Sequence, residues 1–329
     1  MKILLDPRPE QIARLSPPPG TLPRWFAAPI AAAVDKLEIG RNPRDVLFCL
    51  IGKKAASSAL VFNVDLLEAV VSALPFRKTA LISLHQWWPP ELLPTWKHAI
   101  YQNVLRNSRI ILSYSAADTG SLRRRFPGAD VRWIGHFVDT DFFTPSNASS
   151  TNDRYILCPG DHRRLEHVVV AVAEEVGVKV VRFSTDPQVL DYHRTHPSRF
   201  VECCANISFA EVLDLYRHSV LVLNAVDDRH WPVGITTFCE ALATDRPVIT
   251  SAGHSCSGYT FEDGSRPYIT VDDLFNASAW IEKVREALNS PFLWPEGRSP
   301  RDLALSICSY ETMVAAWRII IRDAEAQEI

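Results

Sequence analysis

The chain has 329 residues, of which 47% are hydrophobic, and its formal net charge at pH 7 is −3. This length suits two domains of ordinary size, each large enough to bury its own core. The small negative charge gives no electrostatic basis for nucleic acid as the main partner, so a nucleic-acid-binding protein is not expected.

The cysteines and the apolar runs indicate the cellular compartment. Seven cysteines are scattered along the chain without a Cys-x-x-Cys pair, which is typical of reduced, packed thiols in a cytosolic protein. The N-terminal stretch Met1–Pro7 is too short and too soon charged for a signal peptide. No apolar run is expected to reach the length of a membrane span. We therefore expect a cytoplasmic protein.

The first half of the chain alternates strand-like and helix-like segments, a pattern typical of a parallel α/β sheet. Apolar runs predict strands at Lys2–Leu5, Asp45–Ile51, Thr79–Leu84, Arg109–Ser113 and Asp130–Ile134. Helical periodicity predicts helices at Asn63–Leu74, Leu93–Arg106 and Ser115–Arg125.

His85 follows the Thr79–Leu84 strand at its carboxyl end, the edge where open parallel sheets bind ligands. A lone histidine is more often structural than catalytic, so this position alone leaves both interpretations open. The next loop carries Trp87 and Trp88, which either stack on an acceptor molecule or cap the hydrophobic core.

The predicted helix Ser115–Arg125 ends in three consecutive arginines, Arg123, Arg124 and Arg125. Such a run usually forms a solvated face. The alternative is contact with lipid phosphates, and weak peripheral association with a membrane is therefore kept as a hypothesis.

The stretch Thr144–Asp153 has the composition of a linker, and we place the boundary between the domains there. Strands are predicted after it at Arg154–Cys158, Val178–Phe183, Phe200–Cys204, Val220–Leu223 and Pro247–Thr250. Helices are predicted at Leu165–Val176, Pro187–His193, Ser208–Tyr216, Phe238–Ala243, Ser278–Asn289 and Leu303–Ala324. The predicted domains are residues 1–145 and 154–300, followed by a C-terminal helical segment, residues 301–329.

The clearest functional pattern lies between the predicted strand Val220–Leu223 and the predicted helix Phe238–Ala243. Gly234 in this connection lets the backbone approach a ligand closely, and the N–H groups of the next turn suit an anion. That turn consists of Ile235, Thr236 and Thr237. Glu240 follows within the helix, either as an exposed helix residue or as a carboxylate that accepts hydrogen bonds from ligand hydroxyls.

The segment GITTFCEALATDRPVIT, from Gly234 to Thr250, resembles the donor-binding segment of retaining family-4 glycosyltransferases, also called glycosyl transferases group 1. The resemblance implies the GT-B fold, in which two Rossmann-like domains face each other across a cleft and the last helix crosses back to the first domain. It also implies that Glu240 binds the nucleotide ribose and that the turn after Gly234 binds the diphosphate. Many members of the family carry a second glutamate eight positions earlier, where this chain has Pro232.

Other parts of the chain also resemble the family. Gly160 and the arginines that follow it are similar to a glycine loop with a basic residue that binds the diphosphate, and Arg163 and Arg164 both fit that register. The base-contacting backbone is expected near Cys204. The remaining expected roles are a catalytic histidine beside the donor sugar, His85, and an acid that contacts sugar hydroxyls, supplied by Asp227 or Asp228.

We therefore expect a retaining hexosyltransferase that moves a sugar from a UDP- or GDP-linked donor to the hydroxyl of a glycan, lipid-linked or small-molecule acceptor. The alternatives are a non-catalytic subunit that binds nucleotide sugars or glycans, and a nucleotide-sugar hydrolase or epimerase. No clustered His, Cys and Asp set has the spacing of metal ligands, so we expect no metal and no cofactor. Nucleic acid is not an expected partner.

Overall fold

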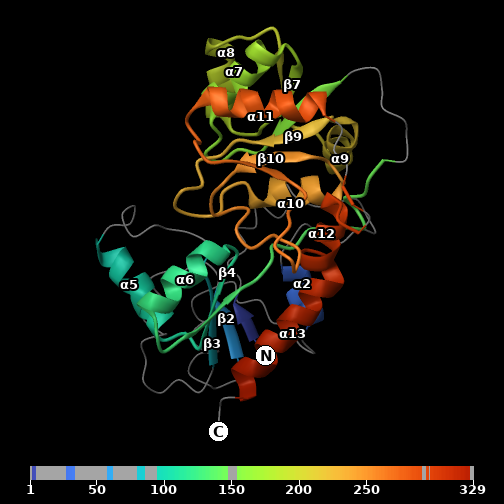
Figure 1. Cartoon of the computed structure of the whole chain (residues 1–329). Coiled ribbons are helices and arrows are strands. Elements are labelled where there is room, and N and C mark those ends of the chain that lie inside the picture. The colour runs from blue at the N-terminus through green and yellow to red at the C-terminus, as the bar shows by residue number, and fades with distance from the viewer. Residues whose placement is uncertain are drawn as a thin grey trace. The chain divides into compact units, whose positions relative to one another are not determined.

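The computed structural model describes residues 2–4, 27–33, 58–61, 80–85, 95–146, 154–290, 294–295 and 297–326 (Figure 1). These residues form two compact units. Unit 1 comprises the described residues up to Gly135 together with those from Glu311 onwards, and unit 2 comprises His136–Tyr310. The predicted strand Asp45–Ile51, the predicted helix Asn63–Leu74 and the pair Trp87–Trp88 lie outside the described residues.

Unit 1 contains a parallel sheet in the order β1-β2-β3-β4-β5. Its strands are β1 (Lys2–Leu4), β2 (Ser58–Val61), β3 (Ala80–His85), β4 (Ile110–Ser113) and β5 (Asp130–Trp133). Its helices are α2 (Ala27–Ala32), α5 (Thr95–Arg106), α6 (Ala116–Arg125) and α13 (Tyr310–Ala326), the last of which starts at the final residue of unit 2.

Unit 2 contains a parallel sheet in the order β11-β10-β9-β6-β7-β8. Its strands are β6 (Tyr155–Pro159), β7 (Lys179–Phe183), β8 (Val201–Cys204), β9 (Leu221–Asn224), β10 (Val248–Ser251) and β11 (Ile269–Val271). Its helices are α7 (Glu166–Val176), α8 (Pro187–Thr195), α9 (Phe209–His218), α10 (Ile235–Ala243), α11 (Ala277–Asn289) and α12 (Pro300–Ile307).

The central strands of unit 2 are continuous apolar runs because both faces of the sheet are covered. All residues of β6, β9 and β10 are buried, and α7 and α11 pack over one face with the fully buried Trp280. The strand order reverses between β6 and β9, which are neighbours in the sheet. This reversal creates the place where open α/β sheets bind ligands.

The segment His136–Phe143 belongs to unit 2 because its contacts lie there. The backbone N–H of His136 donates to the Tyr259 hydroxyl at 2.7 Å, and the Phe143 ring meets the Tyr216 ring edge-on. Arg301 of α12 donates to the carbonyl of Phe143 at 3.1 Å. The contacts therefore divide the described chain at Gly135, and the linker-based domain boundaries stay predictions.

Among the described residues, one helical stretch, Pro300–Ala326, is long and apolar enough to cross a membrane by length and composition alone, because an 18-residue window within it has a mean hydropathy of 1.3. The expectation that no apolar run reaches this length was therefore wrong. The stretch comprises α12 and α13, and it buries Leu303 and Trp317 inside the protein. Arg132 of β5 donates to Asp323 of α13 at 2.8 Å. Of the 18-residue window, 44% is buried inside the protein.

Candidate functional site

Two loops meet at the carboxyl edge of the unit 2 sheet, one after β6 and one after β9. The backbone N–H of Leu165 donates to the Ala225 carbonyl at 3.0 Å, and the N–H of Asp227 donates to the Arg163 carbonyl at 3.0 Å. These bonds bring the predicted glycine loop and the predicted donor-binding segment side by side. They lie at the reversal of strand order between β6 and β9.

Arg164 is a buried cation at this junction. The residue is 9% exposed, and its guanidinium donates to Asn224 Oδ1 at 2.5 Å and to Thr237 Oγ1 at 2.8 Å. Both partners are neutral, and no carboxylate among the described residues forms an ion pair with it. Burial lowers the pKa of the Arg164 guanidinium, which nevertheless stays charged at any physiological pH. A buried charge without a counterion suits an anionic ligand.

Two glycines make room for this guanidinium. Gly160 has φ +103° and Gly234 has φ +78°. Residues that carry a side chain rarely adopt such positive φ angles. A Cβ at Gly234 would lie 2.6 Å from Arg164 Nη1 and 2.6 Å from Asn224 Oδ1, and a Cβ at Gly160 would overlap Arg164 Nη2. Gly234 was interpreted as a place of close ligand approach. In the structure the groups that approach it closely are Arg164 and Asn224.

Helix α10 begins at Ile235, three residues earlier than predicted, with Gly234 as its N-cap and with Arg164 bonded to its first turn. Among the residues that the structure describes, no side chain caps this end of the helix. The first turn, formed by Ile235, Thr236 and Thr237, carries the positive end of the helix dipole. Thr237 also accepts the hydrogen bond from Arg164. The helix N-terminus and the guanidinium together form a positive site suited to a diphosphate.

Arg163 differs from Arg164 although the two are adjacent. It has φ +50°, forms an ion pair with Asp227, and lies over the Trp231 ring with 4.6 Å between guanidinium carbon and ring centroid. Asp227 also accepts from Arg229 at 2.8 Å, and these hydrogen bonds lower the pKa of Asp227 to about 2. Of the two arginines that fit the predicted register, Arg163 is therefore neutralised by a carboxylate, whereas Arg164 donates to neutral partners only.

Asp228 is fully buried and joins two loops. Its carboxylate accepts from the Ser255 backbone N–H at 2.9 Å and from the Ser255 hydroxyl at 2.5 Å. It lies against Gly253, where any Cβ would overlap the carboxylate, so the small residue serves this contact. Burial raises the pKa of Asp228. The contacts give Asp228 a structural role, and its predicted contact with a sugar stays a prediction.

Glu240 lies inside the protein on α10 and is 1% exposed. Its Oε2 accepts a hydrogen bond from the Tyr216 hydroxyl at 2.9 Å. The alternative interpretation of Glu240 as an exposed helix residue was therefore wrong. Glu240 lies on the same helix as Thr237, the hydrogen-bond partner of Arg164. The sequence pattern did not single out Tyr216 or Asn224, because both precede Gly234, where the family-like segment begins.

Replacing Glu240 by glutamine is expected to weaken nucleotide binding by about 1–2 kcal/mol, because a neutral acceptor replaces a charged one. Glutamine keeps the size of the side chain and still accepts from Tyr216. Calorimetry on the folded variant measures the loss. Tyr216→Phe is the matched control for the buried hydrogen bond, and we expect it to weaken binding less. Equal nucleotide affinity in wild type and Glu240→Gln contradicts the assignment.

The remaining predicted site residues are placed as follows. Cys204 is the last residue of β8 and is half-buried, and Asn206 after it has φ +57°. His85 is the last residue of β3, at the carboxyl edge of the unit 1 sheet. Trp87 and Trp88 lie outside the described residues, so their predicted acceptor role stays a prediction.

No protein-family model matches the chain, and no curated protein matches it in sequence. Solved structures match it in fold. Anabaena Alr3699/HepE in complex with UDP-glucose gives a TM-score of 0.69 at 14% identity, over 98% of this chain and 100% of that one. AviGT4, a glycosyltransferase involved in avilamycin A biosynthesis, gives a TM-score of 0.62 at 15% identity, over 99% of this chain and 98% of that one. A glycosyltransferase from Rickettsia africae gives a TM-score of 0.65 at 13% identity, over 89% of this chain and 85% of that one.

The chain has a GT-B glycosyltransferase fold. The expectation of two α/β domains with parallel sheets is confirmed. At these identities the likeness extends to the fold only, so membership of family 4 and the retaining mechanism stay predictions.

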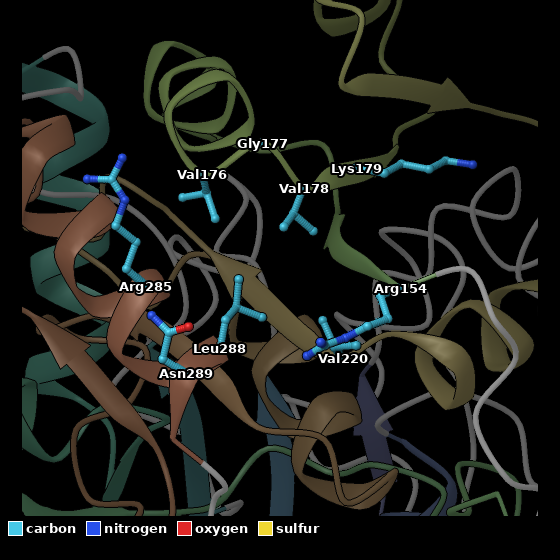
Figure 2. A pocket seen from close by; sticks show the side chains of 9 residues that line it. All are labelled: Arg154, Val176, Gly177, Val178, Lys179, Val220, Arg285, Leu288 and Asn289. Carbon is cyan, nitrogen blue, oxygen red and sulfur yellow. The ribbon is translucent and has the colours of Figure 1, made fainter.

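A pocket of about 490 Å³ lies at the opposite, amino-terminal edge of the sheet in unit 2 (Figure 2). Arg154 and Lys179 stand at the starts of strands there, and Arg285 lies on α11. Lys179 pairs with Glu202, and Arg285 donates to a carbonyl in the last turn of α7. Lys179 and Arg285 are thus neutralised by a glutamate side chain and by the carboxyl end of a helix, respectively. Because the pocket lies at the amino-terminal edge of the sheet, it is separate from the site around Arg164, which lies at the carboxyl edge.

Proposed function

We propose that the protein transfers a sugar from a nucleotide-sugar donor to an acceptor hydroxyl, with retention of the anomeric configuration. The observation that carries this proposal is the buried Arg164 beside the uncapped N-terminus of α10, at the reversal of strand order. A nucleotide sugar carries the diphosphate that such a site would bind. The likeness in fold to Alr3699/HepE, solved with UDP-glucose, supports the same class of donor.

Each part of the donor has a group to bind it. Arg164 and the first turn of α10 would bind the diphosphate, Glu240 would bind the ribose hydroxyls, and the backbone after Cys204 would contact a uracil or guanine base. Negative charge grows on the diphosphate as the glycosidic bond breaks. A fixed guanidinium and a helix N-terminus stabilise that charge without reorganisation, and this lowers the barrier to transfer.

His85→Ala is expected to leave nucleotide affinity unchanged and to slow transfer about tenfold to a hundredfold. We propose that His85, at the carboxyl end of β3, contacts the donor sugar. A hydrogen bond that strengthens as charge develops contributes to kcat more than to ground-state affinity. Steady-state kinetics and calorimetry separate the two effects. Normal turnover in the folded variant would make His85 a structural histidine.

Transfer is expected to survive chelation of divalent cations. Among the residues that the structure describes, no three His, Cys, Asp or Glu side chains gather as a metal site. Arg164 and the helix N-terminus would supply the positive charge that a metal ion supplies elsewhere. The measurement is the transfer rate with and without excess chelator. Loss of activity that magnesium or manganese restores would show that the donor binds with a metal ion.

A panel of UDP- and GDP-linked sugars tests the proposal. Release of nucleoside diphosphate that depends on an acceptor, with a product of unchanged anomeric configuration by NMR, is the expected result. Release without acceptor would indicate a hydrolase. Binding by thermal shift without release would indicate a non-catalytic subunit. Pro232 in place of a glutamate, together with the ion-paired Asp227, is the observation that favours this last alternative.

A further inference from the structure

Helices α5 and α6 cover the same face of the unit 1 sheet. Strands β3, β4 and β5 are neighbours in consecutive order and run parallel. Because crossover connections between parallel strands are right-handed, the two connecting helices lie on one side of the sheet. Figure 1 shows α5 and α6 next to each other. Tyr101 and Leu105 of α5 pack with Leu122 of α6 in one hydrophobic cluster, which leaves the opposite sides of both helices facing outwards.

This pair of helices is strongly basic in a chain that is slightly acidic. Together α5 and α6 contain five lysines and arginines and a single acidic residue, Asp118, which gives a formal charge of +4. The whole chain carries −3. Asp118 is buried, and the Ser113 hydroxyl donates to its carboxylate at 3.5 Å. The outward side of the two helices therefore carries positive charge only.

Three arginines on these helices are exposed and have no carboxylate partner among the described residues: Arg106, Arg124 and Arg125. Arg125 lies beside His98 of α5, with 3.1 Å between the nitrogens, so the end of α6 adjoins the start of α5. Arg123 differs, because its guanidinium donates twice to the Val131 carbonyl and thereby holds β5.

An exposed tryptophan lies on the outward stripe of α5. Trp96 is 55% exposed, and Ala99, Asn103 and Arg106 follow it at intervals of three and four residues, all exposed or half-buried. These intervals place the four side chains on one side of the helix. Tryptophan is enriched where a protein meets the boundary between water and lipid, because its ring is apolar and its N–H is polar.

We propose that the outward face of α5 and α6, the basic face formed by Trp96, Arg106, Arg124 and Arg125, binds the surface of an anionic lipid bilayer. Each arginine near such a surface contributes about 1 kcal/mol, so a few together give weak, reversible attachment. A nucleic acid fits this face less well. It offers one exposed aromatic side chain rather than a row for stacking bases, and the rest of the chain is acidic.

Sedimentation with vesicles tests the proposal. Wild type is expected to sediment with vesicles containing phosphatidylglycerol at low salt and to stay in solution with pure phosphatidylcholine or at 0.5 M salt. Arg124→Gln/Arg125→Gln should lower the partition coefficient about tenfold to thirtyfold. Trp96→Ala should lower it severalfold. The matched control, Arg194→Gln/Arg285→Gln, removes two exposed arginines from unit 2 and should change it less than twofold.

Thermal unfolding confirms that each variant is folded before it is compared. The proposal is overturned if wild type does not sediment with the anionic vesicles, or if neutral vesicles bind it equally well. It is also overturned if the Arg124/Arg125 and control variants lose the same amount of binding. Displacement of the protein from the vesicles by a single-stranded polynucleotide, at phosphate concentrations equal to those of the lipid, would assign the face to nucleic acid instead.

Discussion

Replacing Arg164 by methionine is expected to slow sugar transfer about a hundredfold to a thousandfold, or roughly 2.7–4 kcal/mol. Methionine fills much of the space between Gly160 and Gly234 but removes the charge and the donors. The guanidinium is pre-positioned by Asn224 and Thr237, so no reorganisation is needed when charge develops on the leaving diphosphate. Steady-state kinetics give the change in kcat/KM, and calorimetry gives the change in nucleotide affinity.

Arg163→Met is the matched control, because it removes the same charge one residue earlier. Arg163 forms an ion pair with Asp227 at a partly exposed position, so the loss of transfer should stay below about tenfold. Equal losses in the two variants would contradict the assignment of the diphosphate to Arg164. So would normal transfer by a folded Arg164→Met protein.

Glu166→Gln is expected to destabilise the protein by about 3–5 kcal/mol, because it leaves a buried charge without its partner. Arg182 of β7 is 0% exposed and donates to Glu166 of α7 at 2.7 and 3.1 Å. His193 of α8 lies 2.8 Å from the same carboxylate. These contacts fasten α7 and α8 to the sheet. Chemical denaturation at pH 7 measures the free energy of unfolding.

The carboxylate of Glu166 makes the free energy of unfolding depend on pH. Hydrogen bonds from His193 and Arg182 outweigh burial and lower the pKa of Glu166 to about 2, whereas its ordinary value is 4.5. A lowered carboxyl pKa contributes stability that is complete above pH 4.5 and is lost as the pH falls towards 2. The Glu166→Gln variant should lack this part of the loss of stability at acid pH.

The control Glu202→Gln removes an exposed partner of Lys179 and should lower the free energy of unfolding by less than about 1 kcal/mol. An equal effect of both changes would contradict the account.

The alternation of apolar runs predicted β6 to β10 and α7 to α11 of unit 2 within a few residues, because the central strands are buried on both faces. Strand β11 was not predicted, and the single helix predicted at Leu303–Ala324 is two helices, α12 and α13. Boundaries set by single contacts were harder to predict. Helix α10 starts at Ile235 rather than Phe238, since Gly234 adopts a positive φ and caps it. Strand β2, at Ser58–Val61, was not predicted because so short a segment lacks a distinct apolar run.

Candidate site residues can be named from the sequence where one local segment carries them, but not where residues distant in sequence complete the arrangement. Gly234 and Glu240 lie in one recognisable stretch, whereas the distinction between Arg163 and Arg164 depends on a backbone turn that orients adjacent side chains differently. Asn224 contacts Arg164 across 60 positions of sequence. Ser255 contacts Asp228 across 27 positions. No periodicity or spacing reveals such tertiary contacts.

Calorimetric titration with UDP, GDP and their nucleosides tests most directly whether this site binds a nucleoside diphosphate. The account predicts that one diphosphate binds at least a hundredfold more tightly than its nucleoside, since charge-assisted hydrogen bonds to the phosphates contribute about 1.5–3 kcal/mol each. Most of that difference should disappear in Arg164→Met. Binding of neither diphosphate, or equal affinity for a diphosphate and its nucleoside, would contradict the account.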